Sequence, residues 1–100
     1  MIRVIRKRPG CLPELIQVEN TLEALRQEVG GYIETVTFAQ DVCIICNEEG
    51  RLLGLPYNVT FLGVDFMGTI LIVGVDGEEF SDLPAAYWGT LLSRFGGDAN

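Results

Sequence analysis

The sequence contains no histidine, so the side chain that most often serves as a general base, proton relay or metal ligand near neutral pH is missing. It also lacks the G-x-S-x-G motif of many hydrolases and the glycine-rich loops that bind phosphates. These absences leave no recognisable catalytic signature. We therefore expect a non-enzymatic protein without catalytic residues, a bound metal ion or a cofactor.

Positive charge is scarce, and most of it lies at the start of the chain. The 100 residues include 7 Lys and Arg against 14 Asp and Glu, a net charge of −7. Residues 1–10 carry four basic side chains and no acid, whereas residues 11–100 carry the other three with all 14 acids, a charge of −11. The acidic part repels phosphate backbones, so we expect no nucleic-acid partner. The basic segment, residues 1–10, is typical of a charged edge strand, and its alternative interpretation is a local anion site.

Long hydrophobic runs are missing as well. The most apolar segment, 59–75, contains three glycines and is shorter than the roughly 20 residues that cross a bilayer. Two short buried strands with a connection explain it better. No apolar stretch of signal-peptide length follows the early basic residues. We expect a single cytoplasmic domain spanning residues 1–100, large enough to bury a core, with no membrane partner.

Cysteine is also sparse, with three residues, and an odd number argues against a disulfide framework. Cys43 and Cys46 form a C-x-x-C, but they lie in an apolar, β-branched run that is typical of a strand. Residues three apart on a strand point to opposite faces, so these sulfurs cannot pair with each other. Thiols and imidazoles cannot complete a zinc site either, since Cys11 is remote and histidine is absent. We expect buried, unmodified thiols.

The pattern of apolar and turn residues predicts six strands and two helices. Strands are expected at 1–7, 14–18, 32–38, 42–47, 69–75 and 78–80, with an irregular loop at 51–58. Both faces of 42–47 are apolar, which is typical of a central strand covered on both sides. Gly50 is expected to supply a positive φ in the turn after that strand. The order β-β-α-β-β-loop-β-β-α indicates an α+β fold, a mostly antiparallel sheet with two helices.

Capping residues set the expected ends of the helices. The first helix is expected to begin after Asn20 as N-cap and to end at Gly30, which suits the left-handed position past a helix. The second is expected to begin at Ser81 or Asp82 and to stop at the glycines 96–97. The last three residues are then expected to fray.

The segment 47–58 is the most unusual part of the chain. It combines hydrogen-bonding side chains with an aromatic ring in a loop that glycine and proline constrain. Such a set can bind a planar polar ligand by stacking and hydrogen bonds. The alternative is a loop that closes one end of the sheet, with its asparagines bonded to backbone. The candidate ligand-binding residues are Asn47, Arg51, Tyr57, Asn58 and, from the basic segment, Arg3.

The same segment carries a family resemblance. Residues 43–58, Cys-Ile-Ile-Cys-Asn-Glu-Glu-Gly-Arg-Leu-Leu-Gly-Leu-Pro-Tyr-Asn, resemble the central motif of the domain of unknown function 3846 family, a small family carried by phages and mobile elements. The likeness extends to Asn-Thr-Leu-Glu-Ala-Leu with Val-Gly-Gly-Tyr-Ile-Glu after it, and to Gly-Thr-Ile-Leu-Ile-Val-Gly. The resemblance brings no established activity. It implies a phage or mobile-element origin, and small accessory proteins of that kind often counter host defence.

Two hypotheses about function follow. The first is a non-enzymatic protein that binds and sequesters a nucleotide-type signalling ligand of host defence, with the 47–58 loop in the site. The alternative is a protein–protein inhibitor that docks on a host defence effector through its acidic surface, in the manner of a DNA mimic. A carboxylate enzyme using Glu48 and Glu49 is the least favoured, because adjacent acids after a strand are common turn residues. A homo-oligomer is expected, since a second copy can complete a pocket and bury an apolar sheet face.

Overall fold

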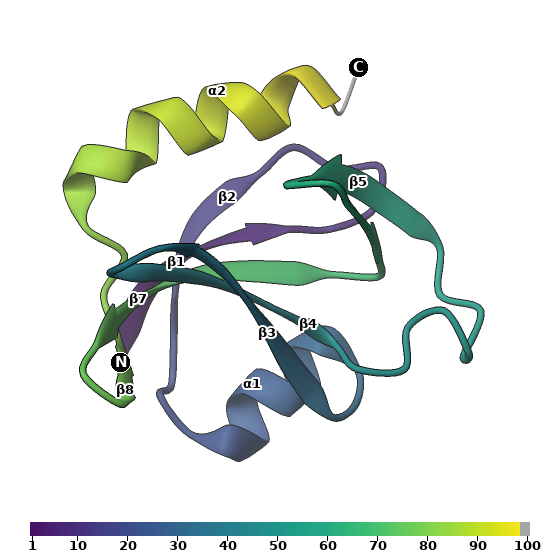
Figure 1. The fold of residues 1–100 in the computed structure, drawn as a ribbon, viewed down its shortest axis with the longest axis horizontal. Helices are drawn as coiled ribbons and strands as arrows, with labels where there is room; N and C mark the ends of the chain where they lie inside the picture. Colours follow the sequence, from purple (N-terminus) through teal and green to yellow (C-terminus); the bar gives the residue numbers. More distant parts are fainter. Residues whose placement is uncertain (99–100) are drawn as a thin grey trace.

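A twisted antiparallel sheet forms the centre of the molecule (Figure 1), as seen in a computed structural model that describes residues 1–98. Its path runs β2-β1-β7-β4-β3, and β8 pairs with the end of β7. The strands are β1 (Ile2–Lys7), β2 (Glu14–Val18), β3 (Ile33–Ala39), β4 (Val42–Asn47), β7 (Ile70–Asp76) and β8 (Glu79–Ser81). A separate hairpin pairs β5 (Tyr57–Phe61) with β6 (Val64–Met67). Every strand pair is antiparallel.

The helices are α1 (Leu22–Val29), a short 3-10 turn η1 (Ala85–Tyr87) and α2 (Trp88–Asp98). This architecture confirms the predicted α+β class with two helices and a mostly antiparallel sheet. The predicted order lacks the β5–β6 hairpin, part of which lies in the expected loop. A bulge between Tyr57 and Val59 breaks the alternation of β5, so that Asn58 and Val59 are both buried. The turn of the hairpin also places Leu62 at φ 55°, where glycine or asparagine is usual.

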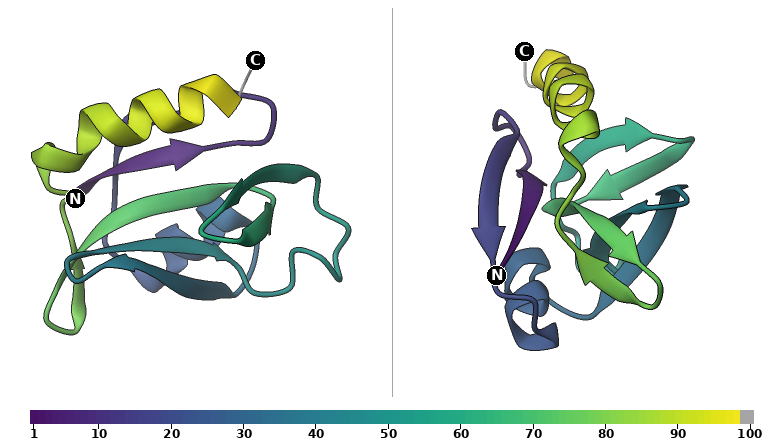
Figure 2. Two further views of the ribbon diagram at one scale, coloured as in Figure 1. Left: turned by 45° about the horizontal axis from the view of Figure 1, so that its top comes forward. Right: turned by 90° about the vertical axis from the view of Figure 1, so that its left-hand side faces the viewer.

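The sheet is buried on both faces, because α2 and the β5–β6 hairpin cover one side and α1 covers the other (Figure 2). Ile44 packs on the first side with Leu91 and Phe95, and Ile45 packs on the second side with Leu25. All six residues of β4 are buried, as predicted for a central strand. Burying each large aliphatic side chain contributes about 1.5–3 kcal/mol relative to exposure, so these two clusters hold the fold together.

The basic segment is not an edge strand. β1 lies between β2 and β7 and exchanges hydrogen bonds with both. The edge-strand interpretation of this segment is therefore wrong. The apolar residues of β1 explain its position, since Val4 and Ile5 are fully buried on opposite faces of the sheet.

The helix ends differ from the prediction at three of four positions. Thr21, not Asn20, is the N-cap of α1, and its hydroxyl accepts a hydrogen bond from the Ala24 amide at 3.1 Å. Gly30 ends α1 at φ 80°, as expected. The Asp82 carboxylate accepts from the Arg3 amide at 2.7 Å instead of capping a helix that starts there. Helix α2 continues through the glycines at 96–97 to Asp98, because the packing of Leu91 and Phe95 outweighs the low helix propensity of glycine. Of the residues expected to fray, 99–100 lie outside the described part.

No helix within residues 1–98 has both the length and the apolar character needed to cross a bilayer.

Candidate functional site

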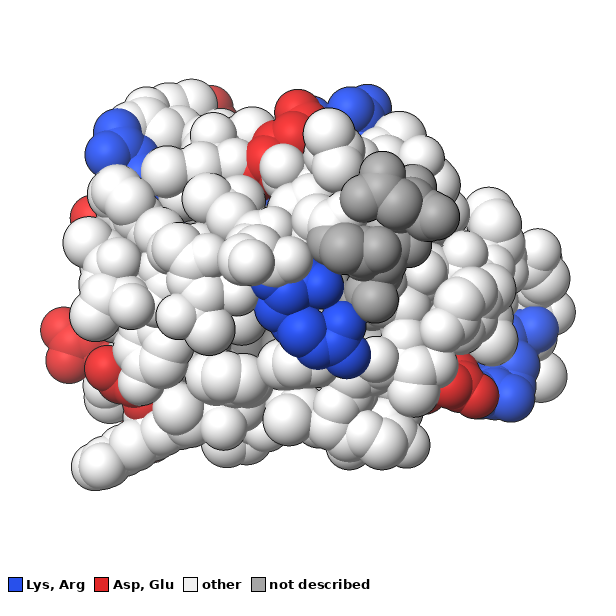
Figure 3. Space-filling model, turned by 90° about the horizontal axis from the view of Figure 1, so that it is seen from above, with Lys and Arg blue, Asp and Glu red and all other residues white. Residues whose placement is uncertain are grey.

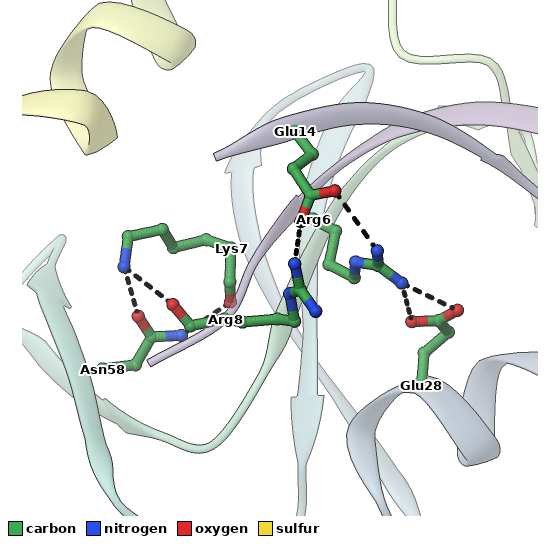
Figure 4. A network of polar contacts seen from close by, with 6 residues as sticks. All are labelled: Arg6, Lys7, Arg8, Glu14, Glu28 and Asn58. Atoms are coloured by element: carbon green, nitrogen blue, oxygen red, sulfur yellow. Dashed lines mark hydrogen bonds and ion pairs between the residues drawn. The ribbon is translucent and has the colours of Figure 1, made fainter. Parts of the chain in front are cut away.

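Two arginines of the basic segment, Arg6 and Arg8, form ion pairs with acids of the same chain (Figure 4). Arg6 forms an ion pair with Glu28 of α1 at 3.1 Å and with Glu14 of β2 at 3.4 Å. Arg8 pairs with the same Glu14 at 2.6 Å. Desolvation acts to raise the pKa of Glu14, but hydrogen bonds and charges from Arg8 and Arg6 outweigh it and hold that pKa below its ordinary value. These two arginines therefore form internal ion pairs and do not converge on an open anion site.

Lys7 turns inward and is almost fully buried. Its Nζ donates to Asn58 Oδ1 at 3.0 Å and to the Arg8 carbonyl at 2.9 Å, as Figure 4 shows. The Asn58 amide nitrogen in turn donates to the carbonyls of Lys7 and Gly68, at 2.7 and 2.8 Å. Asn58 thus joins β1 to the start and the end of the β5–β6 hairpin. Both atoms of its amide group are used inside the protein, so this candidate residue has a structural role.

Asn47 has a similar role at the end of β4. Its Nδ2 donates to the Val29 carbonyl at the end of α1, at 3.0 Å, and its Oδ1 accepts from the Glu49 amide at 2.7 Å. The contact requires glycine at position 31, because a Cβ there would lie 2.9 Å from Asn47 Nδ2. Asn47 therefore ties the loop after β4 to α1, which is the backbone-bonded arrangement that the sequence left open as an alternative.

The loop between β4 and β5 is held in one conformation by its own backbone. The amides of Leu53 and Leu55 donate to the carbonyls of Glu49 and Gly50, at 2.9 and 3.0 Å. Gly50 is not at a positive φ, so that expectation is wrong. Glycine is needed there for space, because a Cβ would lie 2.8 Å from the Met67 carbonyl oxygen. The fixed loop leaves Leu52 85% exposed and Leu53 58% exposed.

A pocket of about 200 Å³ lies beside this loop, between β3, the end of β4 and β6. Its apolar lining includes Val36, Phe66 and Met67, and its charged lining consists of three acids and one arginine: Glu34, Glu48, Asp65 and Arg51. Arg51 and Asp65 approach to 3.9 Å, and both side chains are largely exposed, so this ion pair contributes at most about 1 kcal/mol. The pocket thus combines apolar side chains with a polar lining that carries a net negative charge.

The thiols of β4 have the environment expected for buried structural cysteines. Cys46 belongs to one apolar cluster and Cys43 to the other, which confirms that they point to opposite faces. Burial raises the pKa of each to about 11, and the charge of Glu34 adds to the effect at Cys46. Within residues 1–98, no group of three or more cysteine and carboxylate side chains is arranged to hold a metal ion.

The structure does not bring the five predicted residues together. Asn47 and Arg51 line the pocket beside the loop, whereas Asn58 is buried near the start of β5. Tyr57 is exposed, and its hydroxyl bonds to Thr60 Oγ1 at 2.7 Å. Arg3 lies in a separate hollow of about 440 Å³, with its guanidinium carbon 5.6 Å from the centre of the Trp88 ring. The five residues therefore do not line one common pocket, and ligand binding by any of them stays a prediction.

Sequence reasoning missed the residues that complete the pocket. Glu34 and Asp65 come from strands that flank the loop in space but are distant from it in sequence. Asp65 carried a usable signal, since it is the lone charge in the apolar segment 59–75. The sequence gives no comparable signal for Leu52 and Leu53, because two consecutive leucines in a loop can equally well be buried against the core.

Comparisons with curated proteins and with solved structures found no match. The scan against family models gave a match over residues 2–96, nearly the whole of the described structure. The matching family is the one whose central motif residues 43–58 resemble, and those residues supply β4, the loop after it and the start of β5. The chain therefore belongs to the DUF3846 family, a domain of unknown function.

Proposed function

We propose that this protein is a non-enzymatic binding protein that docks on a partner protein through the loop between β4 and β5. The observation that carries the proposal is the exposure of Leu52 and Leu53 on a loop that is fixed from inside. A single exposed leucine is common on protein surfaces, but two in succession on a braced loop present apolar area in a defined geometry. A surface that is ordered before binding loses little conformational entropy on association.

The charge around the loop favours a protein partner over a nucleotide. Glu48 and Glu49 begin the loop, and Glu34 and Asp65 line the adjoining pocket, so a phosphate placed there meets carboxylates. The amides of Asn47 and Asn58, which were expected to recognise a planar ligand, already bond to backbone groups. An acidic patch beside apolar side chains instead suits a partner surface with a basic rim.

The acidic residues do not cover every face of the molecule. Figure 3 shows the face covered by α2, where charged side chains are few and the two signs are interspersed. A DNA mimic requires a continuous acidic surface, and this face does not provide one. We therefore place the docking surface at the loop and its pocket. We infer that the partner is a host defence protein, because the motif of residues 43–58 implies a phage-type accessory protein.

The test compares the two exposed leucines of the loop with one exposed leucine elsewhere. Immobilised wild-type protein and the double variant Leu52→Ser/Leu53→Ser are used to capture proteins from host-cell extract, and a captured protein is then purified and titrated directly. The control is Leu12→Ser, since Leu12 is also well exposed but lies in the turn between β1 and β2. We expect the double variant to weaken binding at least tenfold and the control to leave it unchanged. Equal binding by all three proteins would contradict the proposal.

The expected homo-oligomer stays a prediction, and light scattering after gel filtration measures it. A dimer that forms at raised concentration and is lost in Leu52→Ser/Leu53→Ser would show that a second copy occupies the loop surface. That outcome would replace the heterologous partner with self-association.

A second candidate function is retention of a small anionic ligand, of nucleotide type, in the hollow that contains Arg3. The supporting observation is the guanidinium of Arg3 over the Trp88 ring, which offers a planar cation and an aromatic surface in one place. The opposing feature is Asp82, which lines the same hollow. The test is a thermal-shift screen with nucleotides, in which a ligand is expected to raise Tm for wild type and not for Arg3→Gln. No shift with any nucleotide would exclude this candidate.

A further inference from the structure

The pocket beside the loop has a lining that indicates what kind of side chain a partner would insert. Glu34, Glu48 and Asp65 bring three negative charges to it, and Arg51 is the lone cation that lines it among residues 1–98. The net charge of the lining is therefore −2. Since Arg51 pairs with Asp65 only at 3.9 Å and both are exposed, a better-placed cation can displace it at little cost.

Part of the pocket lining is apolar, and its residues Val36, Phe66 and Met67 are less exposed than its acids. Val36 and Phe66 pack against or belong to the core cluster of the α2 side, and Met67 lines the same hollow. An apolar floor below carboxylates matches a long basic side chain, whose methylene stem buries on apolar surface while its charged end stays at a polar rim. A volume of about 200 Å³ is below the range of pockets for drug-sized ligands and suits one side chain.

We propose that this pocket receives an arginine side chain of the partner, while Leu52 and Leu53 contact apolar residues next to that arginine. This inference rests on the proposed docking function and names the chemistry of its partner, a protein segment with an arginine beside apolar residues. Arginine is favoured over lysine because its planar guanidinium bonds two carboxylates at once and is less strongly hydrated. Arginine is also enriched in the centres of protein interfaces.

The test titrates the 15N-labelled chain of residues 1–100 with N-acetyl-arginine methylamide and follows backbone amide signals by NMR. The matched probe is N-acetyl-citrulline methylamide, which has nearly the same shape without the charge. We expect saturable shifts of the amides of residues 47–51 and 64–67 with the arginine probe, and binding weaker by about fivefold or more with the citrulline probe. Added salt is expected to weaken the arginine titration, because the pocket is open to solvent.

Two variants distinguish arginine binding in the pocket from attraction to any acidic residue on the surface. Glu48→Gln/Asp65→Asn removes two carboxylates from the lining and keeps the side-chain shapes, and we expect it to weaken arginine binding about fivefold or more. Glu78→Gln, at an exposed acid in the turn between β7 and β8, is expected to leave binding unchanged. Equal shifts with both probes, shifts confined to other parts of the sheet, or an equal loss in both variants would overturn the inference.

The outcome is separable from that of the proposed function. Partner binding that depends on Leu52 and Leu53 without arginine binding in the pocket would leave the docking function standing and remove the arginine. Arginine binding in the pocket with no effect of Leu52→Ser/Leu53→Ser on partner capture would contradict the proposed docking role of the loop.

Discussion

Two asparagines and two leucines within twelve residues show opposite environments. Asn47 and Asn58 are 6% and 7% exposed, whereas Leu52 and Leu53 between them are 85% and 58% exposed. In an ordinary loop the polar side chains face water and the apolar ones face the core. This reversed arrangement is stable because the side-chain amide of each buried asparagine bonds to backbone groups of other elements. Few of its polar atoms are therefore left without a hydrogen-bond partner. The asparagines support the loop, and the leucines remain available for contact.

The largest loss of stability is expected when Asn58 is replaced. Asn58→Ala deletes one acceptor of the Lys7 ammonium and the donor to the carbonyls of Lys7 and Gly68, all at buried positions. We expect the free energy of unfolding to fall by about 3 kcal/mol, because buried polar groups that lose partners cost about 1–3 kcal/mol each. Urea denaturation measures it. Tyr57→Phe, which removes only an exposed hydrogen bond, serves as the control and should change stability by less than about 0.5 kcal/mol.

Replacing Asn47 should cause a smaller loss of stability, and the change should be more local. Asn47→Ala leaves the Val29 carbonyl and the Glu49 amide without this partner, and we expect a loss of about 2 kcal/mol in the free energy of unfolding. Hydrogen exchange should show faster exchange of the amides of Leu53 and Leu55, whose bonds close the loop. Unchanged exchange there would mean that the loop holds its conformation without Asn47.

The ion pairs of the basic segment provide a contrast, since they lie nearer to solvent than the buried amides. The pKa of Glu14 is lowered in the folded protein, so its contribution is fully present above the ordinary carboxyl value of 4.5 and is lost as pH falls through the lower, folded value. We expect stability to fall more steeply with acidification below about pH 4.5 in wild type than in Glu14→Gln. Denaturation midpoints over a pH series measure this difference. Parallel pH profiles would show that the pairs with Arg6 and Arg8 contribute nothing.

The smallest effect on stability is expected at the leucines themselves. Leu52→Ser/Leu53→Ser removes exposed apolar surface that has few partners in the free protein, so we expect a change within about 0.5 kcal/mol. Urea denaturation of the double variant checks it. A loss of 2 kcal/mol or more would mean that these leucines support the fold, and the contrast between the two pairs would then fail.

Much of the fold was accessible from sequence because it depends on local periodicity. The consecutive apolar residues of β4 predicted a strand buried on both faces, and the structure has one. The β5–β6 hairpin was not predicted, because the bulge at its start breaks the alternation and Leu62 replaces the usual turn residue. The candidate site was predicted only in part. The polar residues of the 47–58 segment predict a binding site, but Asn58 points inward because its partners, Lys7 and Gly68, lie on other parts of the chain.

The sequence by itself determined the absence of imidazole chemistry, the strand that carries Cys43 and Cys46 on opposite faces, and the unequal distribution of charge along the chain. Each of these follows from residue identity or from a period of two residues. The tertiary structure alone decided the use of that charge. Arg6 meets Glu28 across 22 positions and Lys7 meets Asn58 across 51, so these two basic residues support the sheet from an inner strand instead of lying on an edge. Such pairs depend on which strands become neighbours, and neighbouring strands are selected by the burial of both sheet faces together.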